Sequence, residues 1–106
     1  MDIMGMMKKA QAMQTKLQEA QDELGRVEVE GASGGGMVSL TMTAKGELRA
    51  VRIDPSLMTP ADKEMLEDLI IAAFADAKVK ADRAAAEKMQ ELTAGLSLPP
   101  GMKLPF

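Results

Sequence analysis

The sequence contains no cysteine, histidine, tryptophan or tyrosine, and its two phenylalanines are Phe74 and Phe106. Without cysteine and histidine, the chain lacks a thiol nucleophile, disulfides, the usual zinc ligands and an imidazole for acid–base catalysis. The scarcity of aromatic rings also argues against a surface on which the bases of single-stranded nucleic acid would stack. We therefore expect no enzyme activity, no cofactor, no metal and no small-molecule substrate.

Long apolar runs are absent as well. The longest unbroken run, from Leu69 to Ala75, is too short to cross a bilayer. Near the N-terminus, Lys8 and Lys9 interrupt what would otherwise be the core of a signal peptide. Because the lack of cysteine also fits a reducing compartment, the sequence predicts a cytoplasmic protein without a membrane partner.

The residues that are present suffice for one folded domain. The chain has 106 residues, 46% of them hydrophobic, and a formal net charge of −3, which predicts a single domain over residues 1–106. Eleven methionines are unusual, and Met1, Met4 and Met7 share a three-residue spacing. A thioether metal site is one interpretation, but without histidine or cysteine we favour flexible packing in a core or a subunit interface.

A helix is predicted over residues 1–24. Its apolar residues recur at alternating spacings of three and four, which forms a heptad stripe along one face. The members of this heptad stripe are Ile3, Met6, Ala10, Met13, Leu17, Ala20 and Leu24. Such a helix would be roughly 33 Å long, and Gly25 is expected to end it in the left-handed conformation.

Residues 25–54 change to a period of two and predict a three-stranded antiparallel sheet. Glycine-containing turns at 32–36 and 44–46 separate the strands. In the third strand, residues 48–53, the apolar positions change parity, so we expect either a β-bulge or a strand with two apolar faces there. The glycine-rich first turn would also suit a phosphate-binding loop, but no Gly-Lys-Ser/Thr sequence and no helix follow it, so a hairpin turn is favoured.

A second, longer helix is predicted over residues 59–94. Thr59 and Asp62 have the spacing of a capping box, and beyond Asp62 no glycine or proline interrupts the chain until Gly95. The first half carries large apolar residues and should cover the sheet, whereas the second half carries alanine and charge and should pack against another helix. A break near Ala77 is compatible with this change of composition.

Acidic residues gather in the first turns of this long helix. Glu64, Glu67 and Asp68 share one face, a pattern compatible with a metal site or a pair of catalytic carboxylates. With no further polar groups beside them, we favour a solvated face at the helix N-terminus, where the helix dipole stabilises negative charge.

Residues 95–106 are predicted to form an extended, proline-rich tail. Pro99, Pro100 and Pro105 exclude a helix. The apolar residues of the tail all occupy even positions, which gives it one apolar edge. This edge should dock on its own domain or on a partner subunit.

Together these elements predict an α+β fold in which both helices project from the sheet as an antiparallel pair. A monomer of this kind would leave the sheet edges, the heptad stripe and the tail uncovered. Symmetric dimers are the commonest way to cover such surfaces, so we predict a homodimer.

The charges are distributed unevenly along the chain. Residues 1–18 carry three lysines against one aspartate, and residues 77–95 carry four cations against three anions. In contrast, residues 19–30 and 59–76 each carry one cation against five acidic residues. The dipole of the long helix would account for its basic end, but not for lysines near the start of the first helix. The pattern favours contact between a polyanion and the outer parts of both helices.

Several segments of the chain resemble the YbaB/EbfC family. In order, they are MKKAQAMQ at 7–14, GASGGG at 31–36 followed by Val38, IDPSL at 53–57, EMLEDLI at 64–70, AAFADA at 72–77 and LPPGMKLPF at 98–106. The resemblance implies a bacterial nucleoid-associated protein, a tweezers-like homodimer with a sheet core and helical arms. It also implies binding of double-stranded DNA with little sequence preference, and a location in the cytoplasm at the nucleoid.

The resemblance offers no short DNA-binding motif, so charge nominates the contact residues. The candidates are Lys8, Lys9 and Lys16 in the first helix, and Lys78, Lys80, Arg83 and Lys88 in the last. Their expected role is to neutralise phosphates without reading bases. Asp82, Glu87 and Glu91 are interleaved with the second group and would weaken it.

An alternative function is that of a protein-interaction adaptor. In that case, the methionine-rich heptad stripe and the apolar tail would contact replication or recombination proteins.

Overall fold

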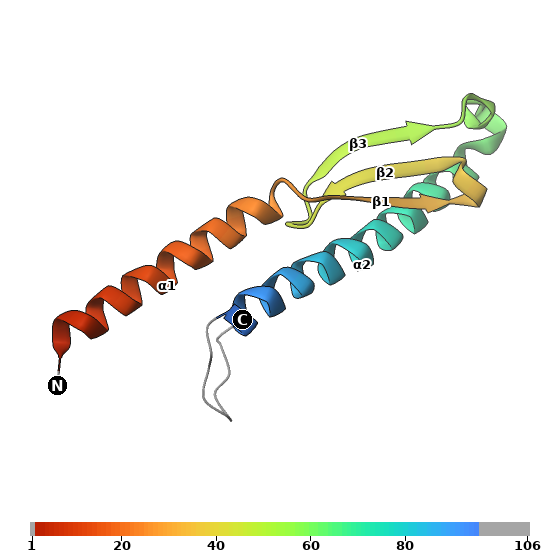
Figure 1. Cartoon of the computed structure of the whole chain (residues 1–106). Coiled ribbons are helices and arrows are strands. Elements are labelled where there is room, and N and C mark those ends of the chain that lie inside the picture. The colour runs from red at the N-terminus through yellow and green to blue at the C-terminus, as the bar shows by residue number, and fades with distance from the viewer. Residues whose placement is uncertain (1, 96–106) are drawn as a thin grey trace.

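The structure is a computed structural model that describes residues 2–95. It consists of an N-terminal helix, a three-stranded antiparallel sheet and a long C-terminal helix (Figure 1), which is the predicted fold class. The radius of gyration is 19.8 Å, against about 13 Å for a compact domain of this length. The molecule is therefore elongated, and the predicted tail at 96–106 lies outside the described residues.

Helix α1, Ile3–Leu24, begins where the Asp2 carboxylate accepts a hydrogen bond from the Gly5 N–H at 3.1 Å. The prediction of a left-handed Gly25 is wrong. Gly25 has a φ of −70° and continues the right-handed turn. The helix ends instead in a right-handed turn, in which the backbone N–H groups of Arg26 and Val27 both donate hydrogen bonds to the Glu23 carbonyl.

The heptad stripe of α1 is covered only near the sheet. Ala20 and Leu24 are buried and Leu17 is half-buried, whereas Ile3 is 67% and Met6 60% exposed. The stripe therefore packs where the second long helix runs beside it, and in a single chain its N-terminal half faces solvent.

The sheet contains β1 (Glu28–Ser33), β2 (Val38–Thr43) and β3 (Leu48–Ile53) in the order β1-β2-β3. The expected bulge is confirmed, because Thr41 pairs with Ala50 while Met42 pairs with Leu48, which leaves Arg49 as the extra residue. The three apolar residues of β2 point to one face and are fully buried: Val38, Leu40 and Met42.

Helix α2, Lys63–Gly95, is a continuous helix of 33 residues that lies across this face and extends beyond the sheet. It has no break at Ala77. Pro60–Asp62 form a short 3-10 turn before it, and there the Thr59 hydroxyl donates to the Asp62 carboxylate at 2.9 Å. Thr59 and Asp62 therefore interact as the capping-box spacing predicts, but the hydrogen bond joins their side chains, whereas in a capping box each side chain bonds the backbone N–H of the other residue.

The contact between α2 and the sheet depends on small residues. Ala73, Ala77 and Ala81 are all fully buried, Ala73 in the core with Val38 and Leu40, and the other two against Met42. A Cβ atom added to Gly31 of β1 would collide with the Ala73 carbonyl oxygen and the Ala77 nitrogen. The prediction that the alanine-rich half of the helix packs only against another helix is therefore wrong, because its first residues, Ala77 and Ala81, pack against the sheet.

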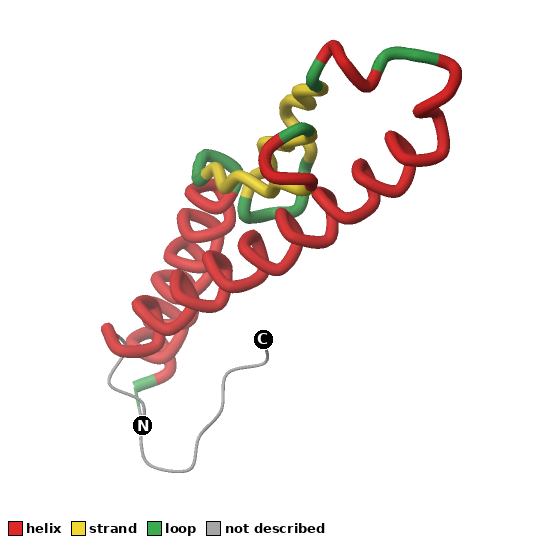
Figure 2. Tube along the Cα trace, turned by 90° about the vertical axis from the view of Figure 1, so that its right-hand side faces the viewer, coloured by secondary structure: helices red, strands yellow, loops and turns green. Residues whose placement is uncertain are grey.

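Beyond the sheet, α1 and α2 run side by side and antiparallel (Figures 1 and 2). We call α1 together with residues 82–95 of α2 the arm. This arrangement confirms the projecting antiparallel pair that the sequence predicts.

The close approach at Gly31 gives a prediction about stability. Gly31→Ala should lower the free energy of unfolding by about 2–3 kcal/mol, because the added methyl group meets backbone atoms that cannot move independently. Urea denaturation followed by circular dichroism measures this change. Gly25→Ala is the control and should change stability by less than about 1 kcal/mol, since Gly25 has a right-handed φ and no neighbour nearer than 3.4 Å to an added Cβ. Equal effects of the two substitutions would contradict the packing argument.

Candidate nucleic-acid interface

The seven candidate cations fall into two groups in the structure. Lys8, Lys9 and Lys16 lie on α1, within the arm, as do Arg83 and Lys88 on α2. Lys78 and Lys80 lie beside the sheet instead, because their neighbours Ala77 and Ala81 are buried against it.

The three lysines of α1 are exposed. None of them forms a hydrogen bond or an ion pair with another of residues 2–95. Lys9 and Lys16 are seven residues apart, so they lie on nearly the same side of the helix, about 10 Å apart along its axis. Their charge is available to an external anion.

Two cations of α2 are paired within their own helix or with the sheet. Lys78 contacts the Asp82 carboxylate at 2.8 Å. Lys80 contacts the Asp76 carboxylate at 3.1 Å and donates to the Glu30 carbonyl of β1 at 2.8 Å. Both are exposed on the surface, where such pairs are weak and are screened by salt.

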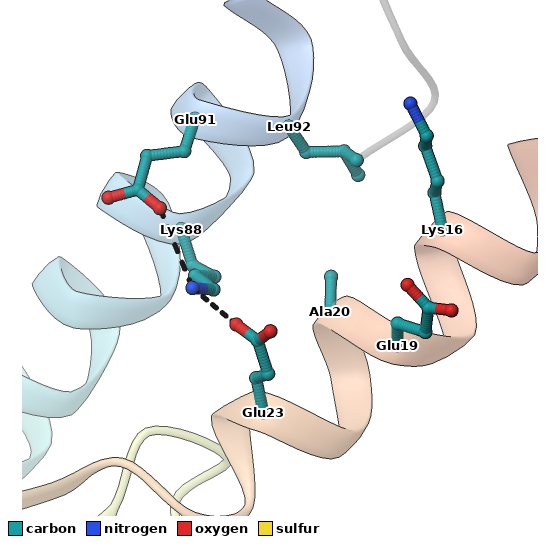
Figure 3. Close-up of a pocket in the computed structure, with 7 residues that line it drawn as sticks. All are labelled: Lys16, Glu19, Ala20, Glu23, Lys88, Glu91 and Leu92. Carbon is teal, nitrogen blue, oxygen red and sulfur yellow. Dashed lines mark ion pairs between the residues drawn. The ribbon is translucent and has the colours of Figure 1, made fainter. Parts of the chain in front are cut away.

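Lys88 is paired across the arm. Its ammonium contacts the Glu23 carboxylate of α1, and the Glu91 carboxylate lies 3.5 Å away (Figure 3). The hydrogen bond with Lys88 lowers the pKa of Glu23, and the same bond raises the pKa of Lys88. Beside this pair is an open cleft of about 300 Å³ between the two helices, and Figure 3 shows the side chains that line it.

Acidic neighbours therefore offset most of the positive charge on α2, whereas the positive charge on α1 has no such partner. Arg83 is exposed and forms no ion pair with the rest of residues 2–95. The acidic residues interleaved with the α2 cations in the sequence had indicated that the positive charge of this group would be weakened. In the structure, Lys78, Lys80 and Lys88 lose it through direct contacts with carboxylates. The carboxylates belong to Asp76, Asp82, Glu91 and, from the other helix, Glu23.

Sequence reasoning missed one cation near the arm. Lys45 occupies the turn between β2 and β3, and its side chain lies 3.7 Å from where a Cβ on Gly25 would stand. It therefore reaches the C-terminal end of α1, where the helix dipole favours a positive charge. The antiparallel pairing of β1 with β2 was the signal that would have placed this turn beside the helix, because it sets Thr43 opposite Glu28, close to the end of α1.

The other candidate sites of the sequence form ordinary surface structure. The Gly34–Gly36 segment is a short 3-10 turn that joins β1 to β2, and all three glycines have positive φ. Glu64, Glu67 and Asp68 are exposed on the first turns of α2. Within residues 2–95, no group of three acidic side chains is placed to hold a metal ion.

Neither α1 nor α2 contains a stretch apolar enough and long enough to span a bilayer.

Comparison with known proteins identifies relatives over the full length. The model of the YbaB/EbfC DNA-binding family matches residues 1–96. A nucleoid-associated protein of Methylocella silvestris is 60% identical, covering 99% of this chain and 98% of that protein. A nucleoid-associated protein of Agrobacterium fabrum is 55% identical over the same shares of the two chains.

A solved structure shows the same fold. The crystal structure of an uncharacterized protein from Helicobacter pylori superposes with a TM-score of 0.69 at 26% identity, covering 91% of this chain and 97% of that one. The arrangement of helix, sheet and long helix is therefore shared with an experimentally determined relative.

The Asp76 carboxylate gives a prediction about pH. The pKa of Asp76 is lowered, first by a hydrogen bond from the Ala32 N–H and then by Lys80. Because the folded-state pKa is below the unfolded value, this charge stabilises the fold above about pH 4 and stops doing so as the pH falls through the folded-state pKa. Asp76→Asn should therefore lower the urea midpoint at pH 6, and the difference from the wild type should shrink towards pH 3.

The control for this measurement is Asp68→Asn. Asp68 is exposed on the same helix and has no hydrogen bond or ion pair with the rest of residues 2–95, so Asp68→Asn should lower the urea midpoint at pH 6 by less than Asp76→Asn does. A difference for Asp76→Asn that stays constant between pH 6 and pH 3 would show that the charge of Asp76 has no stabilising role.

Proposed function

The chain belongs to the YbaB/EbfC DNA-binding family, and we propose that it binds double-stranded DNA at the nucleoid as a homodimer of low sequence specificity. The contacts are made by cations of the arm to DNA phosphates. The observation that carries this proposal is the set of exposed lysines on α1, Lys8, Lys9 and Lys16, which project away from the sheet without a carboxylate partner among the described residues.

Phosphate contact is the chemistry that these lysines fit. A lysine ammonium is a compact point charge that neutralises phosphate and releases counterions, and this interaction carries no sequence information. The acidic sheet end of the molecule would repel DNA, so the orientation of binding follows from the charge distribution. The net charge of −3 is compatible with DNA binding, because residues 1–18, the outer part of α1, carry three lysines against one aspartate.

The cations of α2 play a secondary role in this proposal. Arg83 adds a charge without an acidic partner, whereas Lys78, Lys80 and Lys88 would have to exchange a carboxylate for a phosphate. Because these pairs are exposed, a nearby polyanion can compete for them.

The homodimer is proposed to form along β3. Both β1 and β3 are edges of the sheet, but α2 side chains cap β1, since the Asp76 carboxylate binds the Ala32 N–H at 3.0 Å and Lys80 binds the Glu30 carbonyl. No comparable side chain caps β3 within residues 2–95. An uncapped antiparallel edge suits pairing with the same edge of a second copy about a twofold axis.

Apolar residues beside this edge support the same interface. Leu48 and Val51 pair with buried residues of β2 and so share its apolar face, yet they are 48% and 45% exposed because α2 lies over β1 and β2 instead. A second copy that pairs along β3 would cover this apolar patch.

We propose binding, not catalysis, because the matching family is a DNA-binding family and not an enzyme family. An adaptor role remains the second candidate. It is favoured by the exposed apolar residues at the start of α1, Ile3, Met4, Met6 and Met7. The other contact surface of that hypothesis, the apolar tail, lies outside the described residues. Loss of a defined bound protein after nuclease treatment would favour DNA as the bridging partner and argue against the adaptor.

The dimer proposal predicts the effect of a charge on β3. Val51→Lys should shift the chain from dimer to monomer at micromolar concentration, because the lysine would be forced into the apolar patch at the twofold axis. Analytical ultracentrifugation measures the change. Val79→Lys is the matched control, since Val79 is 57% exposed on α2 away from β3, and this variant should remain dimeric. A dimeric Val51→Lys protein would rule out the β3 interface.

The DNA-binding proposal predicts the effect of charge reversal on α1. Lys8→Glu combined with Lys9→Glu should weaken binding about tenfold or more, and by the same factor for duplexes of unrelated sequence, because phosphate contacts are lost. Fluorescence anisotropy with two labelled duplexes measures both affinities. Lys9→Glu alone is compared with Lys63→Glu, an equal charge change on an exposed lysine at the sheet end of α2. Unchanged affinity in the double variant, or an equal loss in Lys63→Glu, would contradict the assignment of the contacts to α1.

A further inference from the structure

The contact between Glu23 and Lys88 holds the two helices of the arm together. Among residues 2–95 it is the one ion pair that joins α1 to α2. It lies next to Ala20 and Leu24, the buried end of the heptad stripe, and the stripe is exposed further out. The pair therefore lies within the packed part of the arm, about one turn of α1 nearer the sheet than Ala20.

The surroundings of Lys88 are acidic. Its ammonium lies between Glu23 and Glu91, and Glu19 lines the same cleft (Figure 3). Lys16 also lines the cleft but forms no ion pair with these carboxylates. The side chain of Lys88 is 31% exposed, so an anion approaching the cleft can reach it.

Resting on the proposed DNA-binding function, we propose that Glu23 is a positioning residue that holds Lys88 inside the arm until DNA phosphate displaces it. When the pair is intact, α1 and α2 stay together and Lys88 is withheld from the DNA. When phosphate replaces the Glu23 carboxylate, Lys88 becomes a DNA contact and the outer parts of the two helices separate. The spacing of the arm helices thus responds to a bound polyanion.

The weakness of the ion pair and the nearby lysines of α1 both make this exchange feasible. An ion pair with partly exposed partners is weak and is screened by salt, so a phosphate of equal charge can compete with the carboxylate. The lysines of α1 would bring phosphates close to the cleft, because Lys16 lines it. Binding at the exposed lysines therefore supplies the competitor at high local concentration.

The first test measures DNA affinity in Glu23→Gln. Release of Lys88 should tighten binding to random-sequence duplex by about 3–10-fold at low salt and steepen the log–log salt slope by about 0.9, the value for one additional phosphate contact. Glu19→Gln is the matched control, because it removes the same charge from the same cleft without touching Lys88. In a Lys88→Gln background there is no lysine to release, so Glu23→Gln should increase DNA affinity no more than Glu19→Gln does. Equal gains for the two variants in the native background would overturn the proposal.

The second test measures the spacing of the helices without relying on affinity. Because the chain has no cysteine, spin labels can be placed at Gln14→Cys on α1 and Gln90→Cys on α2, both exposed positions on the outer side of the pair. Labelled chains are diluted into excess unlabelled chains, so that the measured distance lies within one subunit. Glu23→Gln should lengthen this distance without DNA, and duplex DNA should lengthen it in the wild type.

The outcomes separate the two proposals. A distance that is identical in the wild type, in Glu23→Gln and in the DNA complex would overturn the positioning role while leaving DNA binding intact. Conversely, if neither the wild type nor any variant binds duplex DNA, the proposed function fails, and Lys88 would then not be a DNA contact even if the distance in Glu23→Gln increases.

Discussion

The close approach between β1 and α2 at Gly31 determines the shape of this molecule. Because neither Gly31 nor the alanines opposite it have large side chains, the helix lies directly on the sheet along several turns. It can then continue without a bend past the sheet edge, which is why the described chain reaches 72 Å in its longest dimension. The arm is a consequence of this contact, since α2 leaves the sheet in a direction that places it beside α1.

The same geometry separates the charges. Residues 59–76 at the sheet end carry five acidic residues against one cation, while the outer part of α1 carries lysines with no carboxylate partner among the described residues. On α2, Lys78 and Lys80 contact carboxylates of their own helix, and Lys88 contacts Glu23 of α1. We therefore propose different roles for the two helices of the arm. The lysines of α1 are free to contact DNA at once, whereas Lys88 of α2 becomes available only after phosphate displaces its carboxylate partner.

Much of the fold could be predicted from the sequence, because periodicity is a local property. The heptad stripe located α1, and the alternation of Val38, Leu40 and Met42 identified the buried face of β2. The change of parity between Ala50 and Val51 indicated the irregularity of β3, which the structure places at Arg49. The errors arose where tertiary contacts decide. Alanines in a helix fit a sheet as well as another helix, so the position of Ala77 could not be inferred from its type.

The candidate site was harder to predict for the same reason. Charge along the chain correctly separated basic from acidic segments, but it could not reveal that Lys88 would face Glu23 across the arm, or that Lys45 would reach the end of α1. Such contacts join residues far apart in sequence, and only the packing of α2 on the sheet brings them together.

Lysine reactivity towards a small acylating reagent, quantified by mass spectrometry with and without duplex DNA, tests the central claim most directly. The account predicts that DNA protects Lys8, Lys9 and Lys16, while Lys63 at the other end of the molecule reacts at the same rate in both samples. Protection of Lys63 with unchanged reactivity on α1 would contradict it.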